Sequence, residues 1–249
     1  MYSIFKQKPK LKEIIPNGYV DIHSHILPGI DDGAETINQS AELLQQLQSL
    51  GFSACIATPH INPGVWNNTP TIIKETFQQT LLNLEGSEKQ LLTHCASEYM
   101  LNDTFVETMA SEPLMTLKGN YILVELSYIN PPLALKEIIF DIRHKGYQPI
   151  LAHPERYIYY HQNPKIYPDL KNAGLSFQLN LLSTVGYYGP SVAKTADFLL
   201  KEEMIDFVGS DIHHTKHAQA FSQKLTLTSE KKLQQAMERN SFFATPKGE

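Results

Sequence analysis

Cysteine is scarce in this chain, and the two that are present exclude one kind of chemistry. Cys55 and Cys95 both lie inside apolar, strand-like runs, so we expect buried free thiols in a reducing compartment. Neither is followed by an arginine at the spacing of a cysteine-dependent phosphate-binding loop. Any chemistry on phosphate esters would therefore have to depend on metal ions.

Long apolar runs and an excess of positive charge are also missing. No stretch approaches the ~20 apolar residues of a membrane helix, and the N-terminus has no apolar signal segment, so we expect a cytoplasmic protein. The formal net charge is −5, without the basic stripe that is typical of nucleic-acid-binding proteins. This balance argues against a nucleic-acid partner.

The N-terminal residues differ in character from the rest of the chain. Lys6, Lys8, Lys10 and Lys12 predict that residues 1–17 form a solvated extension, with contact to an anionic membrane or partner as the alternative. Residues 18–249 are then expected to form a single domain, because 249 residues with 42% hydrophobic side chains suit one sizeable soluble core.

From residue 18 onward, seven strand-like runs alternate with helix-like ones. One helix, for example, is predicted to have Thr69 as its N-cap and Pro70 at its first position. Such alternation predicts parallel strands with crossover helices. We therefore expect an α/β fold, a closed or nearly closed seven-stranded (β/α) barrel, with an open doubly wound sheet as the alternative. The expected strands are 19–23, 53–58, 90–97, 121–124, 149–152, 175–179 and 205–208.

The first of these strands leads into a His-x-His motif. His23 and His25 are two residues apart, and side chains at that spacing on a strand point the same way, so both can bind one ion. Pro28-Gly29 then ends the strand, and Asp31 and Asp32 follow on a turn. Imidazoles with a nearby carboxylate suit a borderline or hard divalent metal ion.

Potential metal ligands recur at the carboxyl ends of the later strands, where barrel enzymes place their catalytic groups. The set is too large for one ion and suits a cluster of two or three. It consists of His23, His25, Asp32, His60, Glu98, Glu125, His153, Asp211 and His213.

Five motifs in this order resemble those of the polymerase-and-histidinol-phosphatase (PHP) superfamily. They are Asp-Ile-His-Ser-His at 21–25, Thr-Pro-His at 58–60, Ser-Glu-Tyr at 97–99, His-Pro-Glu-Arg at 153–156 and Gly-Ser-Asp-Ile-His at 209–213. Within that superfamily, Leu-Pro-Gly-Ile-Asp-Asp-Gly at 27–33 and His-Pro-Glu-Arg-Tyr at 153–157 resemble the bacterial capsule-type tyrosine-protein phosphatases. The resemblance implies a distorted seven-stranded barrel with three metal ions, usually manganese; iron, cobalt, magnesium and zinc stay open.

The resemblance also implies how the ligands are shared among the ions. His23, His25, Glu98 and Asp211 would hold the first ion, and Glu98 would bridge to a second held by Glu125 and His153. The third would be held by Asp32, His60 and His213. The family pattern favours Asp32 over its neighbour Asp31, a choice that spacing alone leaves open.

The implied reaction is hydrolysis of a phosphomonoester by a metal-bound hydroxide. Two ions roughly 3.5–4 Å apart would share and activate the hydroxide. The third ion and Arg156 would neutralise the remaining phosphoryl oxygens, Arg156 with a bidentate fork; a salt bridge from Arg156 to Glu155 or a barrel acid is the less favoured alternative. His60 is a candidate general acid, with a metal-bound water as the alternative. Five tyrosines are candidates for stacking on a substrate ring, with loop anchoring or a subunit contact as an equal alternative for all of them: Tyr157, Tyr159, Tyr160, Tyr187 and Tyr188.

The expected substrate is therefore a phosphotyrosine protein. By resemblance it would be a bacterial tyrosine kinase that controls capsular or exopolysaccharide synthesis, which could bring the enzyme near the membrane; an oligomer stays open. The alternative is a small-molecule phosphatase of histidinol-phosphate or sugar-phosphate type. A nucleic-acid phosphoesterase and a metal-binding scaffold are disfavoured.

Three histidines and one asparagine are predicted to lie outside the ligand set. His94 falls too far down its strand to reach the mouth and is expected to be a hydrogen-bonded core residue. His214 and His217 are expected to be exposed. Asn180 ends a strand at the same mouth, where binding to substrate or a ligand and simple capping are about equally favoured.

Overall fold

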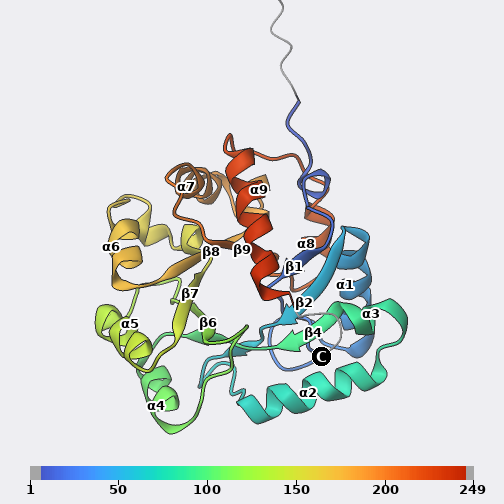
Figure 1. Ribbon diagram of the computed structural model, residues 1–249, viewed down its shortest axis with the longest axis horizontal. Helices are drawn as coiled ribbons and strands as arrows, with labels where there is room; N and C mark the ends of the chain where they lie inside the picture. Colours follow the sequence, from blue (N-terminus) through green and yellow to red (C-terminus); the bar gives the residue numbers. More distant parts are fainter. Residues whose placement is uncertain (1–6, 245–249) are drawn as a thin grey trace, which may run out of the picture.

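The computed structural model describes residues 7–244, in which nine strands form two sheets. The first sheet has the order β1-β2-β4 and the second the order β3-β5-β6-β7-β8-β9, and every pairing in both is parallel. Figure 1 shows the strands at the centre of the molecule. Their bounds are Tyr19–Asp21 (β1), Phe52–Ala57 (β2), His60–Ile61 (β3), Leu92–Cys95 (β4), Glu98–Met100 (β5), Tyr121–Glu125 (β6), Gln148–Ala152 (β7), Ser176–Asn180 (β8) and Phe207–Gly209 (β9).

The parallel α/β architecture is confirmed, but the prediction of seven strands in one closed barrel is not. The second predicted strand ends at Ala57 and resumes as β3, and the third ends at Cys95 and resumes as β5. Pro59 lies in the first gap and has no N–H to donate to a sheet ladder. The carbonyl of Pro59 instead accepts from Glu98 N (3.1 Å), which aligns β5 with β3.

The two sheets also meet where the chain leaves β1 and β9. Asp211 N donates to His23 O (2.8 Å) and His25 N donates to Ile212 O (2.9 Å). On the other side of the same segment, Thr58 N donates to Ser24 O (2.8 Å). These bonds hold the His-x-His segment between the chain that follows β9 and the chain that follows β2.

Helices surround the strands on the outside (Figure 1). The predicted start of α2 is confirmed, since Thr69 Oγ1 accepts from Ile72 N (3.2 Å) and Pro70 is the first helical residue. The helices are α1 (Ile37–Ser49), α2 (Pro70–Asn83), α3 (Gly86–Leu91), α4 (Asp103–Ser111), α5 (Leu135–His144), α6 (Ile166–Ala173), α7 (Pro190–Lys201), α8 (Thr215–Ala220) and α9 (Glu230–Arg239). Short 3-10 turns are η1 (Leu11–Glu13), η2 (Pro154–Arg156), η3 (Ile158–Tyr160), η4 (Leu181–Val185) and η5 (Asn240–Phe243). Within the described part of the chain, none of these helices combines the length and the apolar character needed to cross a membrane.

Apolar side chains fill both faces of the strands. A large cluster packs the helices against the outer faces, with Leu44, Ile139 and Leu199 among its buried members. A smaller cluster, which includes Val20 and Leu123, gathers residues from the other faces of both sheets. Burial on both faces is typical of parallel sheets covered by crossover helices. Cys55 and Cys95 are buried and unpaired, as predicted.

Part of the lysine-rich N-terminal segment is packed and not solvated. Leu11 and Ile14 are buried in the large core cluster, which the lysine pattern did not predict. Leu11 N donates to Gln223 O and Leu225 N donates to Pro9 O, both at 3.0 Å. Lys8, Lys10 and Lys12 therefore belong to a segment that lies against residues 221–226. Lys6 lies outside the described residues.

Candidate metal centre

All nine predicted ligands meet at one side of the sheets, at or beyond the carboxyl ends of β1, β2, β4, β6, β7 and β9. His23 and His25 follow β1, His60 and Glu98 begin β3 and β5, and Glu125 ends β6. His153 follows β7, and Asp211 and His213 follow β9. Asp32 comes from the loop between β1 and α1 and is the one strongly exposed member, with 52% of its side chain accessible.

The first group surrounds the two histidines of the His-x-His motif. His23 Nε2 lies 3.2 Å from His25 Nε2, 3.1 Å from Glu98 Oε2 and 3.2 Å from Asp211 Oδ1. His25 Nε2 lies 3.4 Å from each of the same two carboxylate oxygens. The four residues predicted for the first ion therefore converge on one point.

Glu98 connects this first group to a second. Its Oε1 lies 3.1 Å from His153 Nε2, whereas its Oε2 faces His23, His25 and, at 3.3 Å, His60 Nδ1. Glu125 Oε1 lies 2.9 Å from the same His60 nitrogen. Glu98 thus lies next to both groups, and the bridging role that the resemblance implies for it stays a prediction. His153 and Glu125 belong to separate close sets around it, His23–Glu98–His153 and His60–Glu98–Glu125.

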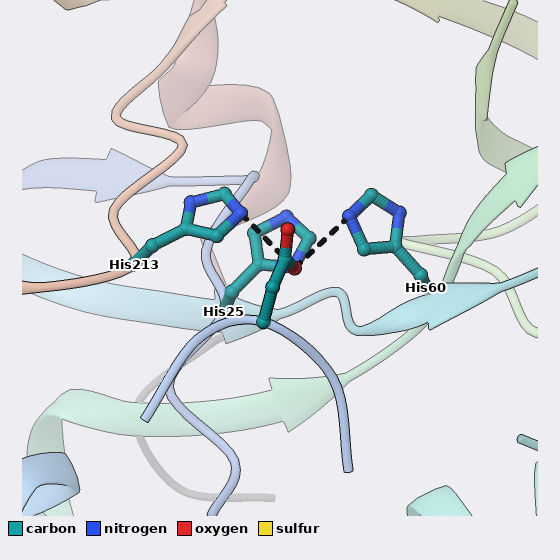
Figure 2. Close-up of side chains that lie close together, drawn as sticks. His25, His60 and His213 are labelled. Atoms are coloured by element: carbon teal, nitrogen blue, oxygen red, sulfur yellow. Dashed lines mark ion pairs between the residues drawn. The ribbon is translucent and has the colours of Figure 1, made fainter. Parts of the chain in front are cut away.

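The third group surrounds Asp32, and Figure 2 shows three imidazole rings around its carboxylate. Asp32 Oδ1 lies 3.4 Å from both His60 Nε2 and His213 Nε2. His25 joins this group as well, because its ring stacks on that of His213 with centroids 4.0 Å apart. The predicted trio of Asp32, His60 and His213 is brought together, with His25 as an additional member.

Asp31 has a different position from Asp32. Its carboxylate is buried, with Oδ2 2.8 Å from His25 Nδ1 and Oδ1 accepting from Gly33 N at 3.0 Å. The tight turn depends on Gly33, because a Cβ at that residue would lie 1.9 Å from His25 O. Asp31 therefore orients His25 from behind, while Asp32 faces the open side of the cluster.

Three of the imidazoles have a hydrogen-bond acceptor at Nδ1 that fixes their orientation. Gln178 Oε1 lies 2.7 Å from His23 Nδ1, Asp31 Oδ2 lies 2.8 Å from His25 Nδ1, and Asp211 O lies 2.9 Å from His213 Nδ1. An acceptor at Nδ1 holds the ring proton there and leaves the lone pair on Nε2 directed into the cluster. This pattern is characteristic of metal-binding histidines in proteins.

The donor set fits divalent metal ions. The Nε2 atoms of His23 and His25 lie 3.2 Å apart with no proton to share in this tautomer. Among the described residues, the buried Nδ1 of His153 has no hydrogen-bond partner, and that of His60 lies 2.9 Å from Glu125 Oε1 without completing a hydrogen bond. Burial would raise the pKa of Glu98, but the neighbouring His23 and His60 lower it well below its usual value, which favours the ionised carboxylate. Neutral nitrogens with ionised oxygens suit borderline and hard cations.

Two of the candidate ligands have strained backbones. His153 has φ 36° and Asp211 has φ 51°, in the left-handed region that residues other than glycine seldom adopt. Such conformations cost of order 1–3 kcal/mol each and are concentrated at functional sites. Gly209 allows the close approach of β9 to β1, since a Cβ there would lie 2.7 Å from that of His23.

Comparison with known proteins places this centre in a family. The family model described as "Capsular polysaccharide synthesis, CpsB/CapC" matches residues 19–248. The chain belongs to the CpsB/CapC family. Tyrosine-protein phosphatase YwqE of Bacillus subtilis (strain 168) is 31% identical over 213 residues, which cover 85% of this chain and 84% of that protein. Tyrosine-protein phosphatase CpsB of Streptococcus pneumoniae is 27% identical over 202 residues, covering 78% and 83%.

The fold agrees with this membership. A chain from the crystal structures of YwqE from Bacillus subtilis and CpsB from Streptococcus pneumoniae, described as metal-dependent tyrosine phosphatases, superimposes with a TM-score of 0.74. That chain is 32% identical in sequence, and the match covers 81% of this CpsB/CapC chain and 84% of that one.

Arg156, on the turn η2, lies beside the metal ligands. Its Nη1 donates to Asp211 Oδ2 at 2.7 Å, and its guanidinium carbon lies 4.2 Å from the Tyr188 ring centre and 4.9 Å from that of Tyr128. Asn180 Nδ2 donates to the same Asp211 oxygen at 2.8 Å. Arg156 and Asn180 therefore hold Oδ2 of Asp211, while Oδ1 faces the histidines.

The predicted ring-stacking tyrosines separate into two classes. Tyr188 contacts Arg156, and Tyr187 packs edge-on against Tyr188 with centroids 5.1 Å apart. Tyr157 is fully buried and donates to Ala152 O at 3.1 Å. Tyr159 donates to Ser127 O at 3.0 Å, and Tyr160 is buried. Tyr157, Tyr159 and Tyr160 therefore anchor loops, which is the alternative role considered for them.

Two predictions about histidines are wrong, those for His94 and His217. Three residues that support or contact the site were not predicted: His217, Gln178 and Tyr128. His94 is exposed, although its Nε2 does lie 2.9 Å from Thr116 O. His217 is buried, and burial lowers its pKa to about 3. Its Nδ1 accepts from His213 N (3.2 Å) and so supports the His213 loop. Gln178 was also missed; the available signal was a polar residue inside the apolar run 175–179. Tyr128 gave no local signal.

Proposed function

We propose that this CpsB/CapC protein is a metal-dependent protein-tyrosine phosphatase. The single observation that carries the proposal is the convergence of five imidazoles and four carboxylates at one mouth, with oriented lone pairs directed inward. The names of its relatives, tyrosine-protein phosphatases YwqE and CpsB, supply the substrate class.

We further propose three manganese ions shared as the resemblance implies. His23, His25, Glu98 and Asp211 would hold the first, and Glu98, Glu125 and His153 the second. Asp32, His60 and His213 would hold the third. Close groups that contain His23, His25 and Asp211, and Asp32, His60 and His213, support the first and third sets. The second is supported by Glu98, which belongs to one close group with His153 and to another with Glu125. The scaffold would be a distorted seven-stranded barrel if β2 with β3, and β4 with β5, each count as one interrupted strand.

When bound, the ions would supply positive charge for the phosphoryl oxygens and a water activated for attack. Arg156 would bind a phosphoryl oxygen with the N–H groups that do not engage Asp211, at a position fixed by the rings of Tyr128 and Tyr188. Both ring nitrogens of His60 face carboxylates, which supports ion binding over proton donation for this residue. A tyrosyl leaving group departs as a phenolate with a pKa near ~10 and needs less protonation than an alkoxide.

The proposed partner is a bacterial tyrosine kinase of capsular or exopolysaccharide synthesis. This assignment is supported by the description of the CpsB/CapC family as one of capsular polysaccharide synthesis. The kinase would present phosphotyrosine in an accessible segment, because six of the nine candidate ligands are buried and Asp32, with 52% of its side chain exposed, lies at the open side.

Turnover of a phosphotyrosyl peptide, measured beside histidinol phosphate, tests the proposal. With added manganese we expect the peptide to be the better substrate by kcat/KM, and we expect EDTA to abolish its hydrolysis. Arg156→Lys is expected to retain bound manganese but lose most turnover, because an ammonium cannot reproduce the planar fork. Preference for histidinol phosphate would replace the proposal with a small-molecule phosphatase, and full activity in EDTA would refute metal dependence.

A further inference from the structure

Tyr128 lies on the loop between β6 and α5, three residues after the candidate ligand Glu125. The base of this loop is fixed, because Tyr157 Oη accepts from Leu126 N at 2.9 Å and Tyr159 Oη donates to Ser127 O at 3.0 Å. Tyr128 itself is 47% exposed. It is therefore an aromatic side chain held at the mouth with about half of its surface free.

The buried part of Tyr128 contacts two residues of the site. Its ring is nearly parallel to that of His153, with centroids 5.8 Å apart and an interplanar angle of 21°. The guanidinium carbon of Arg156 lies 4.9 Å from its centroid. Among the described residues, the Tyr128 hydroxyl makes no hydrogen bond that would explain its presence as a structural tether.

Other aromatic side chains near the mouth are less well placed. Tyr188 covers Arg156 from a second side, at 4.2 Å, and its hydroxyl accepts from Asn180 Nδ2 (3.1 Å). Tyr187 packs on His217 and Tyr188, and Tyr157 is fully buried. Tyr128 alone among these contacts both Arg156 and a candidate metal ligand through its ring while keeping a large free surface.

We infer that Tyr128 recognises the phenyl ring of the substrate and so selects aryl over alkyl phosphomonoesters. The inference rests on the proposed function, since it assumes that the phosphoryl group is bound between Arg156 and the ions. The phenyl ring, which is bonded to the ester oxygen, would then lie against the half-exposed side chain of Tyr128. Aromatic rings attract each other in offset or edge-to-face geometry, an interaction that an alkyl ester cannot make.

A purely structural role for Tyr128 makes a different prediction. If Tyr128 only positioned Arg156, its loss would weaken every phosphomonoester equally, because all carry the same phosphoryl group. The ratio of aryl to alkyl affinity therefore distinguishes recognition of the ring from support of the guanidinium. Phenylphosphonate and methylphosphonate are suitable probes, since neither is hydrolysed and they differ only in the organic group.

The experiment measures dissociation constants of both phosphonates by calorimetry on the manganese-loaded protein. We expect the wild type to bind phenylphosphonate more tightly than methylphosphonate. In Tyr128→Ala the ratio of the two dissociation constants should fall about tenfold, whereas Tyr128→Phe should keep the wild-type ratio. Ile129→Ala is the matched control on the same loop, because Ile129 is 85% exposed and belongs to neither the metal ligands nor the Arg156 contacts. It is expected to leave the preference unchanged.

An equal loss of both phosphonates in Tyr128→Ala, or a loss of preference in Ile129→Ala, would overturn the inference. Unchanged metal content and melting temperature verify that the variants are folded. Hydrolysis of a phosphotyrosyl peptide by the wild type is measured in parallel. If that reaction is absent, the proposed function fails independently, and the phosphonate ratio still shows whether Tyr128 binds aromatic rings.

Discussion

Hydrogen bonds link strands β1 and β9 at their amino ends and link the segments that follow them at their carboxyl ends. The two junctions differ in how their buried polar groups are hydrogen-bonded. At the amino end, the buried Asn240 donates to Val20 O at 2.8 Å and to Val208 O at 2.6 Å, and its Oδ1 accepts from Val208 N at 3.1 Å. At the carboxyl end, His23 and Asp211 are also joined through the backbone. Gln178 holds Nδ1 of His23, and Arg156 and Asn180 hold Oδ2 of Asp211, but His23 Nε2 and Asp211 Oδ1 face only other candidate ligands.

The difference separates stability from function. Buried polar groups in proteins are nearly always hydrogen-bonded, and Asn240 follows that rule. The nitrogens of His23 and His25 lie 3.2 Å apart, and the backbone of Asp211 is left-handed, so the other junction is costly without a ligand. We infer that the amino end stabilises the fold, whereas the side chains at the carboxyl end are compatible with metal binding.

The largest expected effect comes from removing the bridging carboxylate. Glu98→Gln should reduce turnover of a phosphotyrosyl peptide by about a thousandfold or more, because charge stabilisation by the ions contributes several kcal/mol. Bound manganese should fall while circular dichroism stays unchanged. Glu137→Gln, at an exposed position on α5, is the matched control and should behave like the wild type. An active Glu98→Gln enzyme would remove the basis for a shared bridging ligand.

The opposite junction should respond in stability alone. Asn240→Leu leaves the carbonyls of Val20 and Val208 and the Val208 N–H without their partner, so we expect a loss of about 3 kcal/mol in the free energy of unfolding. Manganese affinity should be unchanged. Urea unfolding and calorimetric titration test the two halves of this prediction, with Asn83→Leu on the exposed face of α2 as control. Loss of metal affinity would show that the two ends are not independent.

Removing an orienting group should have an intermediate effect. Gln178→Leu deletes the acceptor 2.7 Å from His23 Nδ1, and losses of this kind cost about 10- to 100-fold in metal affinity. Gln178→Glu restores an acceptor at the same place and should recover most of the affinity. Equal affinities in the wild type and Gln178→Leu would mean that Gln178 does not orient His23.

The smallest expected effect is a pH dependence of the free energy of unfolding that bound metal should remove. Burial lowers the pKa of His25, but Asp31 and the other carboxylates raise it well above its ordinary value in the metal-free protein. A raised folded-state pKa adds stability below the unfolded value of about 6.5 and loses it as pH rises toward the folded value, at no more than about 1.4 kcal/mol per pH unit per proton. Between about pH 6.5 and the folded-state pKa, the metal-free protein should therefore become less stable as the pH rises. With manganese bound the imidazoles are neutral, so this loss should disappear; identical pH slopes with and without manganese would contradict it.

The sequence was sufficient for features that local chemistry decides. The N-cap at Thr69 and the positions of the strands depend on neighbouring residues. The N-cap was predicted correctly, and the predicted strand ends differ by up to two residues from those of β1, β2, β4, β6, β7, β8 and β9. The convergence of the nine candidate ligands could be predicted because all except Asp32 lie at or near a strand end, and parallel strands bring those ends together. Features that depend on distant packing were not found. The contact of Tyr128 with Arg156 joins different loops, and the burial of Leu11 against residues 221–226 was hidden by the lysines around it.

The interruption of two predicted strands and the different positions of Asp31 and Asp32 could not be predicted from the sequence, for physical reasons. Pro59 was visible in the sequence, but its effect depends on which strand lies opposite its carbonyl. Spacing could not distinguish the adjacent aspartates. The turn at Gly33 places Asp31 behind His25 and leaves Asp32 facing His60 and His213.

Anomalous diffraction from crystals grown with abundant manganese tests the central claim most directly. The account predicts three manganese peaks at the mouth, one among His23, His25, Glu98 and Asp211, one beside Glu98, Glu125 and His153, and one beside Asp32, His60 and His213. A single peak, or these side chains directed away from one another with no metal between them, would contradict it.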